Sequence, residues 1–297
     1  MEDKFYPKIF TIADDKSKSS QNRYINFNRA SLVLIIIFAI SSIFTYNNQG
    51  PNWLIIICTA AVILSTLINI YILFRRPEKK WYEGRAIAES VKTLSWKYMV
   101  GSQPYDLMTN DVNILFKDNL KKIIRQDKDF LKLIGDEKNE NYFITDKMKE
   151  IRSSDFKYRK QIYLNDRIQN QINWYSKNTK RNKIYKSITL ILIILFQSVA
   201  VILFCIENFT ELKFSYSFTS LLITLTTVSM TWLQMKRYQE LTDAYSVTAN
   251  ELKKIHENEF NVTNDEDLNK YVDDSEAAIS REHTLWMARR DNVELYN

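Results

Sequence analysis

The residue types that carry out catalysis are few and scattered in this chain. Its two histidines, His256 and His283, are too few for a histidine-rich metal site, and its four glycines stand too far apart for a phosphate-binding loop. Glu282 directly precedes His283 and offers an acid–base pair, although a histidine at a surface or between helices explains the same residues more simply. We therefore expect that the protein is not an enzyme and has no cofactor and no bound metal.

A second set of polar residues lies within a stretch that has no charged residue. The window SLLITLTTVSMTWLQM, residues 220–235, carries hydroxyl groups along its whole length. Five of its polar residues recur at steps of four, three, four and three, which keeps them on one face of a helix. This polar stripe consists of Ser220, Thr224, Thr227, Thr231 and Gln234. It is either a seam against another helix or the wall of a pore.

A shorter stripe occurs earlier in the chain and consists of Thr59, Thr66 and Asn69. Serine and threonine can bond the carbonyl one turn back on their own helix, whereas amide side chains are harder to satisfy in hydrocarbon. We therefore expect Asn69, Gln197 and Gln234 to face protein or water. Both stripes are candidate pore-lining residues.

The elements that position these stripes are membrane-spanning helices. Residues 30–74, 187–206 and 214–235 contain no Asp, Glu, Lys or Arg. A spanning helix needs about 20 mostly apolar residues, so the first region is long enough for two spans, and it contains the turn YNNQGPN. The sequence therefore predicts four spans in two hairpins, near 30–46, 53–74, 187–206 and 216–235.

Basic residues are concentrated on one side of these spans. The short turns of the two hairpins hold Lys213 as their only basic residue, whereas the long segments carry Lys and Arg close to every span. The positive-inside rule therefore predicts that both termini and all the long segments are cytoplasmic. The net charge of +6 is explained by this topology and by the anionic inner leaflet, so we expect no nucleic-acid partner.

The hairpin and the helix that follows it occur twice. At an offset of 156 residues, the apolar run at Ser31 falls on the run at Ser187, and beyond the hairpins Tyr82 falls on Tyr238. Apolar runs match one another by chance, but a match in polar helices at the same offset is harder to obtain. The repeating unit is a two-span hairpin followed by a cytoplasmic amphipathic helix.

The segments between the spans are also typical of helices. In EKKWYEGRAIAESVKTLSWKYM, apolar residues recur at helical spacing, and Arg85 and Glu89 stand one turn apart, either as a structural ion pair or as gating residues. Pro77 should kink the chain before this helix, whereas no proline interrupts 216–257, which we expect to form one rod. Asp155 should cap a helix that runs directly into the third span.

Further helices are expected at 111–134, from Thr145 onwards and at 275–290, with a linker and a short helix at 261–274. The predicted fold is an all-α integral membrane protein in which long helices extend the spans into a cytoplasmic helical domain. Its expected segments are a cytoplasmic N-terminus (1–29), the first hairpin with its amphipathic helix (30–110), a cytoplasmic helical insert (111–155), the second hairpin with long flanking helices (156–260) and a C-terminal helix (261–297).

Three stretches of the chain resemble the bacterial SLATT family of two-transmembrane effectors: WYEGRAIAESVKTLSWKYMVGSQPY, RIQNQINWYSKNTKRN and REHTLWMARR. The residues that carry the resemblance are Trp81, Arg85, Glu89, Trp96, Pro104, Tyr105, Arg167, Gln171, Trp174, Tyr175, Glu282, His283, Trp286 and Arg290. The resemblance implies two SLATT-type units in tandem. It also implies a membrane effector that compromises the membrane when a sensor or a nucleotide-synthesising partner is triggered. The candidates for gating or structural roles are Arg85, Glu89, Trp96, Trp174, Glu282 and His283.

We expect an oligomeric effector of the bacterial inner membrane that forms a pore or channel in a nucleotide-signalling or anti-phage defence system. A single bundle of four spans has too little polar surface to enclose a water path, so a pore needs several copies. The expected partners are the lipid bilayer, further copies of the chain, and a nucleotide second messenger or a sensor protein. The alternatives are a non-conducting scaffold whose cytoplasmic helices bind proteins and, third, an enzyme at the membrane surface that uses Glu282 and His283.

Overall fold

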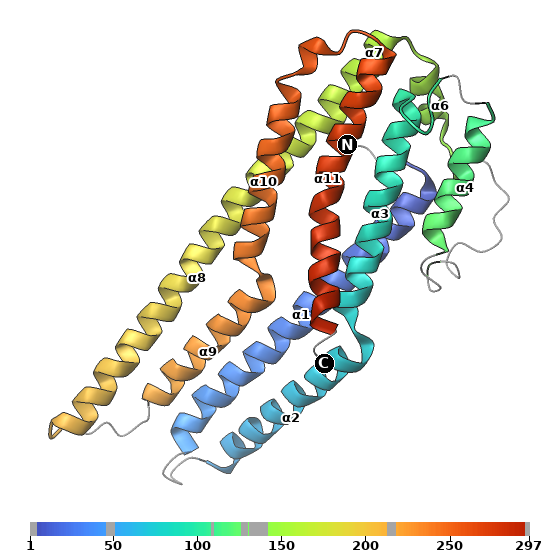
Figure 1. The fold of residues 1–297 in the computed structure, drawn as a ribbon. Helices are drawn as coiled ribbons and strands as arrows, with labels where there is room; N and C mark the ends of the chain where they lie inside the picture. The colour runs from blue at the N-terminus through green and yellow to red at the C-terminus, as the bar shows by residue number, and fades with distance from the viewer. Residues whose placement is uncertain are drawn as a thin grey trace. The chain divides into compact units, whose positions relative to one another are not determined.

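The computed structural model describes residues 5–45, 51–107, 110–125, 130, 142–212 and 218–294, with the backbone alone at 45 and 282–294. Every regular element in these residues is a helix (Figure 1). The predicted all-α fold is therefore confirmed.

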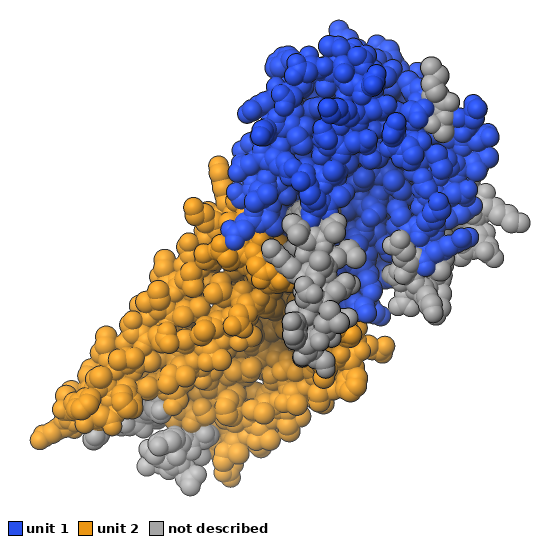
Figure 2. Space-filling view, in the orientation of Figure 1, with its two compact units in different colours: residues 1–20, 78–178, 243–297 blue, residues 21–77, 179–242 orange. Residues whose placement is uncertain are grey.

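The chain divides into two compact units that alternate along the sequence (Figure 2). Unit 1 consists of Met1–Ser20, Glu78–Asn178 and Asp243–Asn297, and unit 2 consists of Gln21–Pro77 and Thr179–Thr242. Unit 2 thus holds the four predicted spans, and unit 1 holds the predicted cytoplasmic helices.

Unit 2 is built from α1 (Lys8–Thr45, from residue 21 onwards), α2 (Asn52–Arg75), α8 (Asn170–Phe209, from residue 179 onwards) and α9 (Phe218–Lys236). Among the described residues, three helical stretches are long and apolar enough to cross a membrane: Lys8–Phe44, Asn52–Arg75 and Phe156–Phe209. Their most apolar windows are only 17–22% buried, so most of these side chains face outwards, as they do in a helix that contacts lipid.

The helix α9 is not among these three stretches. It is 19 residues long, and its hydroxyl-bearing residues lower its hydropathy. The structure therefore supports a membrane protein with three apolar spans, and the fourth span remains a prediction.

Small polar residues join α1 to α2 within unit 2. The hydroxyl groups of Ser31 and Ser65 lie 2.9 Å apart, and the Ser31 hydroxyl is also 3.1 Å from the Asn69 amide oxygen. Cys58 and Ala61 are buried on the same face of α2. Small residues let two spans approach closely, and each hydrogen bond satisfies a polar group that lipid cannot.

Both hairpins end at an arginine in the left-handed backbone conformation. Arg76 (φ 44°) separates α2 from α3 (Pro77–Val100), and Arg237 (φ 49°) separates α9 from α10 (Tyr238–His256). The first break confirms the kink predicted from Pro77. The second break contradicts the predicted rod 216–257, because the chain can leave the α conformation without a proline. If the two hairpins are aligned at these breaks, Pro77 corresponds to Tyr238. In the alignment at an offset of 156 residues, Tyr82 corresponds to Tyr238.

Unit 1 contains α3, α10 and the following further elements: α4 (Val112–Ile124), α6 (Asp146–Ser153), α7 (Phe156–Ile162), a π-helical stretch (Tyr163–Gln169) that leads into α8, a 3₁₀ turn (Glu259–Asn261) and α11 (Asp265–Glu294). Side chains cap two of these helices, and the cap at Asp155 was predicted. The Thr145 hydroxyl accepts a hydrogen bond from the backbone N–H of Met148 at 3.2 Å, and the Asp155 carboxylate accepts one from that of Tyr158 at 3.2 Å.

Two helix boundaries differ from the prediction. The helix expected over 111–134 ends at Ile124, and Gly135, its predicted stop, lies outside the described residues. The short helix expected after a linker within 261–274 is present, but it is continuous with the predicted last helix, because α11 begins at Asp265 and continues to Glu294. Its first turn holds three acidic residues, which favour the positive end of the helix dipole.

Aromatic side chains fill the core of unit 1. The rings of Tyr98 and Phe116 have centroids 4.7 Å apart, and the ring of Tyr105 lies 5.4 Å from that of Phe116. Trp96 is fully buried, and its ring lies 5.7 Å from that of Tyr163. These contacts join α3 and α4 to the π-helical stretch.

Candidate functional site

A buried ion pair lies in the core of unit 1. Arg167, on the π-helical stretch, donates two hydrogen bonds to the Glu276 carboxylate of α11: Nε to Oε1 at 2.8 Å and Nη2 to Oε2 at 2.7 Å. The side chains of Arg167 and Glu276 are 0% and 1% exposed. This side-by-side geometry is the strongest arrangement available to a guanidinium and a carboxylate.

Two hydroxyl groups complete the surroundings of the carboxylate. Tyr163 donates to Oε1 of Glu276 at 3.1 Å, and Thr93 of α3 donates to Oε2 at 2.7 Å. Each carboxylate oxygen therefore accepts two hydrogen bonds, which offsets part of the cost of burying the charge. Three segments far apart in the sequence thus meet at Glu276.

The helix that carries Arg167 has an irregular backbone at this point. Residues 163–169 adopt π-helical geometry between α7 and α8. Short π-helical stretches are rare and are frequently found at functional sites. Tyr163 and Arg167 both lie in this stretch and both reach Glu276, so the ion pair holds the irregular turn in place.

The surroundings of this centre shift the pKa values of its arginine and of its tyrosine. Burial alone would lower the pKa of the Arg167 guanidinium, but the Glu276 carboxylate raises that pKa above its ordinary value. Burial, reinforced by the charge of Glu276, raises the pKa of the Tyr163 phenol well above its ordinary value. The two shifts favour the charged form of the guanidinium and the neutral form of the phenol. This centre is suited to holding helices together.

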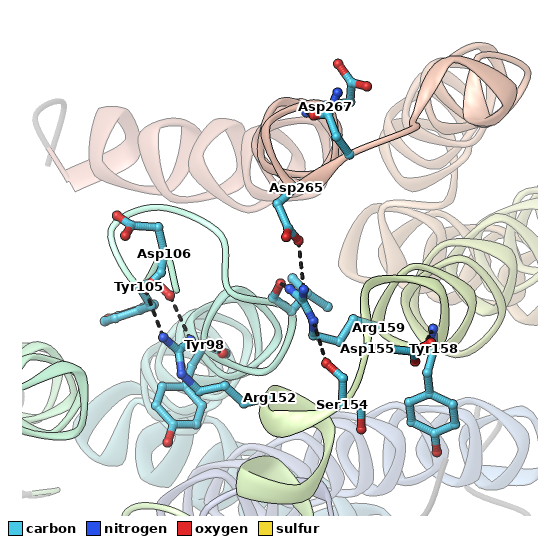
Figure 3. A network of polar contacts seen from close by, with 12 residues as sticks. Tyr98, Tyr105, Asp106, Arg152, Ser154, Asp155, Tyr158, Arg159, Asp265 and Asp267 are labelled. Atoms are coloured by element: carbon cyan, nitrogen blue, oxygen red, sulfur yellow. Dashed lines mark hydrogen bonds and ion pairs between the residues drawn. The ribbon is translucent and has the colours of Figure 1, made fainter. Parts of the chain in front are cut away.

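A second polar network closes the C-terminal end of α3 (Figure 3). Arg152 donates to the backbone carbonyl groups of Tyr98, Tyr105 and Asp106 at 2.7–2.9 Å. Arg159 donates to the carbonyl groups of Val100 and Ser154 at 2.7 and 3.1 Å, and to the Asp265 carboxylate at 2.8 Å. The last carbonyl groups of a helix have no partner within it, so the two arginines satisfy those of α3 and tie its end to α11.

The family-derived candidates occupy different surroundings in unit 1. Arg85 and Glu89 lie on α3 and are half-buried. Trp96 is a core residue, whose indole N–H donates to the Tyr6 hydroxyl at 2.9 Å. Trp174 is 42% exposed and packs against Tyr245 with ring centroids 5.1 Å apart. Glu282 and His283 lie on α11, among the residues whose side chains are not described.

The polar stripe of α9 lies on the surface of unit 2. Ser220, Thr227, Thr231 and Gln234 are exposed, and Thr224 is half-buried. Its threonine hydroxyls donate to the carbonyl groups of their own helix at 2.9–3.0 Å. Thr226, which lies off the stripe, is buried, although it makes the same kind of hydrogen bond. Within the described residues, most of the stripe is therefore not covered by another helix of the chain.

The shorter stripe of α2 is divided between two surroundings. Thr59 and Thr66 are exposed, and each donates to the carbonyl group one turn back at 2.9 Å. Asn69 instead turns to α1 and accepts a hydrogen bond from Ser31. The Asn69 side chain is itself exposed, so one hydrogen bond joins its amide to α1 while its surface stays open.

Sequence reasoning did not find Glu276 or Tyr163, although the resemblance named Arg167. One signal was available for Glu276. It stands between Val272 and Ile279, which are 0% and 1% exposed, on the buried face of α11. A carboxylate on an apolar helix face needs a buried cation. Among the described residues, no cluster of His, Cys, Asp or Glu could hold a metal ion.

These features define a helical membrane protein whose unit 1 is held together by buried arginines. The comparison with family models identifies the family. The SMODS and SLOG-associating 2TM effector domain 3 (SLATT_3) matches residues 7–160, and the SMODS and SLOG-associating 2TM effector domain 1 (SLATT_1) matches residues 163–286. The chain belongs to the SLATT family and contains two SLATT domains in tandem, as predicted. Searches of curated proteins and of solved structures gave no match.

Proposed function

We propose that the protein is a homo-oligomeric, pore-forming effector of the bacterial inner membrane that acts in a nucleotide-signalling or anti-phage defence system. In this proposal unit 2 spans the membrane four times, and unit 1 and both termini are cytoplasmic. A nucleotide second messenger or a sensor protein triggers opening, and Arg85 and Glu89 are candidates for gating. The SLATT assignment supports the effector role, and the observation that carries the pore is the outward face of the α9 stripe.

Contacts between α8, which enters the second hairpin, and α10, which leaves it, support α9 as a fourth span. Trp174 precedes the apolar part of α8 and contacts Tyr245 of α10. Nearer the membrane, the rings of Tyr185 and Tyr238 lie 5.8 Å apart. In this proposal α8 carries the chain away from these contacts, α9 returns it through unit 2, and α10 makes the contacts again. A bilayer that α8 crosses would then be crossed by α9 as well.

The exposed stripe supports contact with water or with another copy of the chain. Lipid offers no hydrogen-bond partner, and Gln234 at the cytoplasmic end of the stripe is an exposed amide. Thr226 and Thr227 have the same side chain and the same local hydrogen bond, yet only Thr227 faces outwards. Among the described residues, the face of α9 that carries the polar stripe is thus the one that the chain leaves uncovered.

A second amide supports oligomerisation. Gln197 lies at the centre of the predicted third span and is exposed on unit 2. In the part of the chain that the structure describes, its side chain has no hydrogen-bond partner. An amide without a hydrogen-bond partner at the middle of a bilayer raises the free energy by roughly several kcal/mol. A neighbouring subunit or a water path is therefore the expected partner.

The test is release of a small dye from liposomes that contain the full-length protein. The stripe variant Thr224→Val, Thr227→Val, Thr231→Val removes three outward hydroxyls. The matched control, Thr189→Val with Thr226→Val, removes two buried hydroxyls that also bond to their own helices. We expect the wild-type protein and the control to release dye, and the stripe variant to release it several-fold more slowly.

The outcomes separate the pore from a scaffold. Wild-type protein that assembles but never releases dye, with or without cyclic or linear oligonucleotides, would favour the non-conducting scaffold. Equal loss of release in the control and the stripe variant would attribute the effect to packing of the spans. Size and symmetry of the particle in nanodiscs provide an independent check, because a pore lined by α9 needs a closed ring.

A further inference from the structure

Two cations from two helices of unit 2 lie against one tryptophan, and a third cation from another helix of unit 2 acts on one of them. The Arg29 guanidinium of α1 lies 5.9 Å from the centre of the Trp232 ring, and the Lys236 ammonium of α9 lies 5.5 Å from it. Arg181 of α8 is close enough to act electrostatically on Lys236. We call Arg29, Arg181 and Lys236 the interfacial cation cluster.

The charges of this cluster are not compensated by the chain. In the described part of the protein, none of the three side chains has a carboxylate partner. Burial, together with the positive charges of Arg29 and Arg181, lowers the pKa of the Lys236 ammonium. A lysine that is repelled by two arginines is stabilised by an anion placed close to all three cations.

Two neighbouring cations provide a contrast. The Lys186 ammonium donates a hydrogen bond to the side chain of Gln239, and Arg237 forms an ion pair with Glu240. These residues line a cavity of about 200 Å³ at the break between α9 and α10. Arg237 is thus paired with a carboxylate and Lys186 is bonded to a neutral amide, whereas the interfacial cation cluster has neither kind of partner among the described residues.

The cluster lies at the boundary of the predicted spans. Arg29 is the last residue before the charge-free region 30–74, and Lys236 is the first residue after the charge-free region 214–235. Trp232 stands one turn inside the end of α9. Tryptophan favours the depth of the lipid headgroups, and long basic side chains extend along apolar surface to place their charge there.

We propose that the interfacial cation cluster is a binding site for the phosphate headgroup of an anionic phospholipid such as phosphatidylglycerol. The two guanidinium groups offer paired N–H donors that match phosphate oxygens, and the lysine adds a point charge. The inference rests on α9 being a span, as proposed above, but not on the existence of a pore. A bound lipid would connect α1, α8 and α9 on the cytoplasmic side, where the helices that lead to unit 1 leave the bilayer.

The test is lipid retention by the full-length protein in detergent, measured by native mass spectrometry. Phosphatidylglycerol and phosphatidylcholine are added in separate titrations. The cluster variant is Arg29→Gln, Arg181→Gln, Lys236→Gln. The control, Lys149→Gln, Lys157→Gln, Lys254→Gln, changes the net charge equally at exposed positions of unit 1. We expect the cluster variant to lose at least about tenfold in apparent affinity for phosphatidylglycerol, and the control to retain wild-type affinity.

Several results would overturn the proposal. These are equal retention of phosphatidylglycerol by the cluster variant and the control, and equal retention of phosphatidylcholine and phosphatidylglycerol by the wild-type protein. Full displacement of phosphatidylglycerol by millimolar inorganic phosphate would assign the site to a soluble phosphate compound. If the cluster variant fails to fold, Arg29→Gln and Lys236→Gln alone must each reduce retention relative to Lys254→Gln. Because retention needs no conduction, its failure is distinguishable from failure of the pore.

Discussion

The guanidinium of Arg167 and the carboxylate of Glu276 meet through two parallel hydrogen bonds, although 109 residues separate them in the sequence. Arg167 lies in the first part of the second SLATT domain, and Glu276 lies near its end. Their pairing therefore closes this domain upon itself. It does so at the root of the long helix that leads into the third predicted span.

Removing one partner of this pair is expected to destabilise unit 1 strongly. Glu276→Gln leaves a buried guanidinium without a counter-charge, which costs about 3–5 kcal/mol. The measurement is the thermal unfolding midpoint of the detergent-solubilised protein, followed by the fluorescence of buried Trp96. The control is Glu251→Gln, whose partner Arg281 is largely exposed, and it should cost no more than about 1 kcal/mol.

The double variant Arg167→Met with Glu276→Leu distinguishes a buried-charge effect from lost packing. Replacing both charges by apolar side chains of similar size leaves no unpaired ion, so this variant should unfold at a higher temperature than Glu276→Gln. A double variant that is less stable than Glu276→Gln would contradict the assignment of the cost to an uncompensated charge.

Stability should fall at alkaline pH through the buried tyrosines. Burial raises the pKa of the phenols of Tyr6, Tyr163 and Tyr271 in the folded protein. In the unfolded chain a tyrosine ionises near pH 10. The contribution of these phenols is therefore fully present below pH 10 and decreases as the pH rises above that value.

The absorbance of tyrosinate tests this pH dependence. The buried phenols should ionise together with loss of the folded state, above pH 10, and not in a separate earlier step. Tyr163→Phe should reduce the slope of stability against pH in this range, while costing about 1 kcal/mol at neutral pH through the lost hydrogen bond to Glu276. Ionisation of all tyrosines near pH 10 in a protein that remains folded would contradict the burial of these groups.

Gly84 is required by the close approach of α1 and α3. A Cβ atom at this position would lie 3.0 Å from the backbone nitrogen of Ser17 and 3.1 Å from the carbonyl oxygen of Ala13. Backbone atoms cannot rotate away, so Gly84→Val should force α1 to move and cost about 1–3 kcal/mol. The thermal midpoint of Ser90→Ala, at an exposed position of the same helix, should stay within experimental error of the wild-type value.

Features that depend on neighbouring residues in the sequence were predictable. Charge-free runs identified the apolar helices, and the cap at Asp155 followed from a side chain that bonds three residues along the chain. The break at Arg76 followed from Pro77, since proline disfavours the α conformation in the residue before it. Local chemistry determines each of these features.

Features that depend on long-range partners were not predictable. The break at Arg237 has no proline, and in the structure its backbone carbonyl accepts a hydrogen bond from Leu241 while its side chain pairs with Glu240. Glu276 lay next to the region predicted as a linker and a short helix, and nothing near it in the sequence indicates that its partner is Arg167. Likewise, Thr59 and Asn69 share a stripe in the sequence, but only Asn69 meets a partner on α1.

The final prediction concerns Gln197, the exposed amide at the centre of the third predicted span. If it bonds to another subunit, Gln197→Leu should weaken association by about three- to twentyfold, since hydrogen bonds between spans contribute about 0.6–1.7 kcal/mol. The measurement is the dimerisation or oligomerisation constant from dilution in detergent or lipid. Ile194→Leu, an apolar exchange at an exposed position of the same helix, is the control and should leave the constant unchanged. Stronger association of the Gln197→Leu variant would show that the amide faces water, because removing a hydrated group makes an apolar interface easier to close.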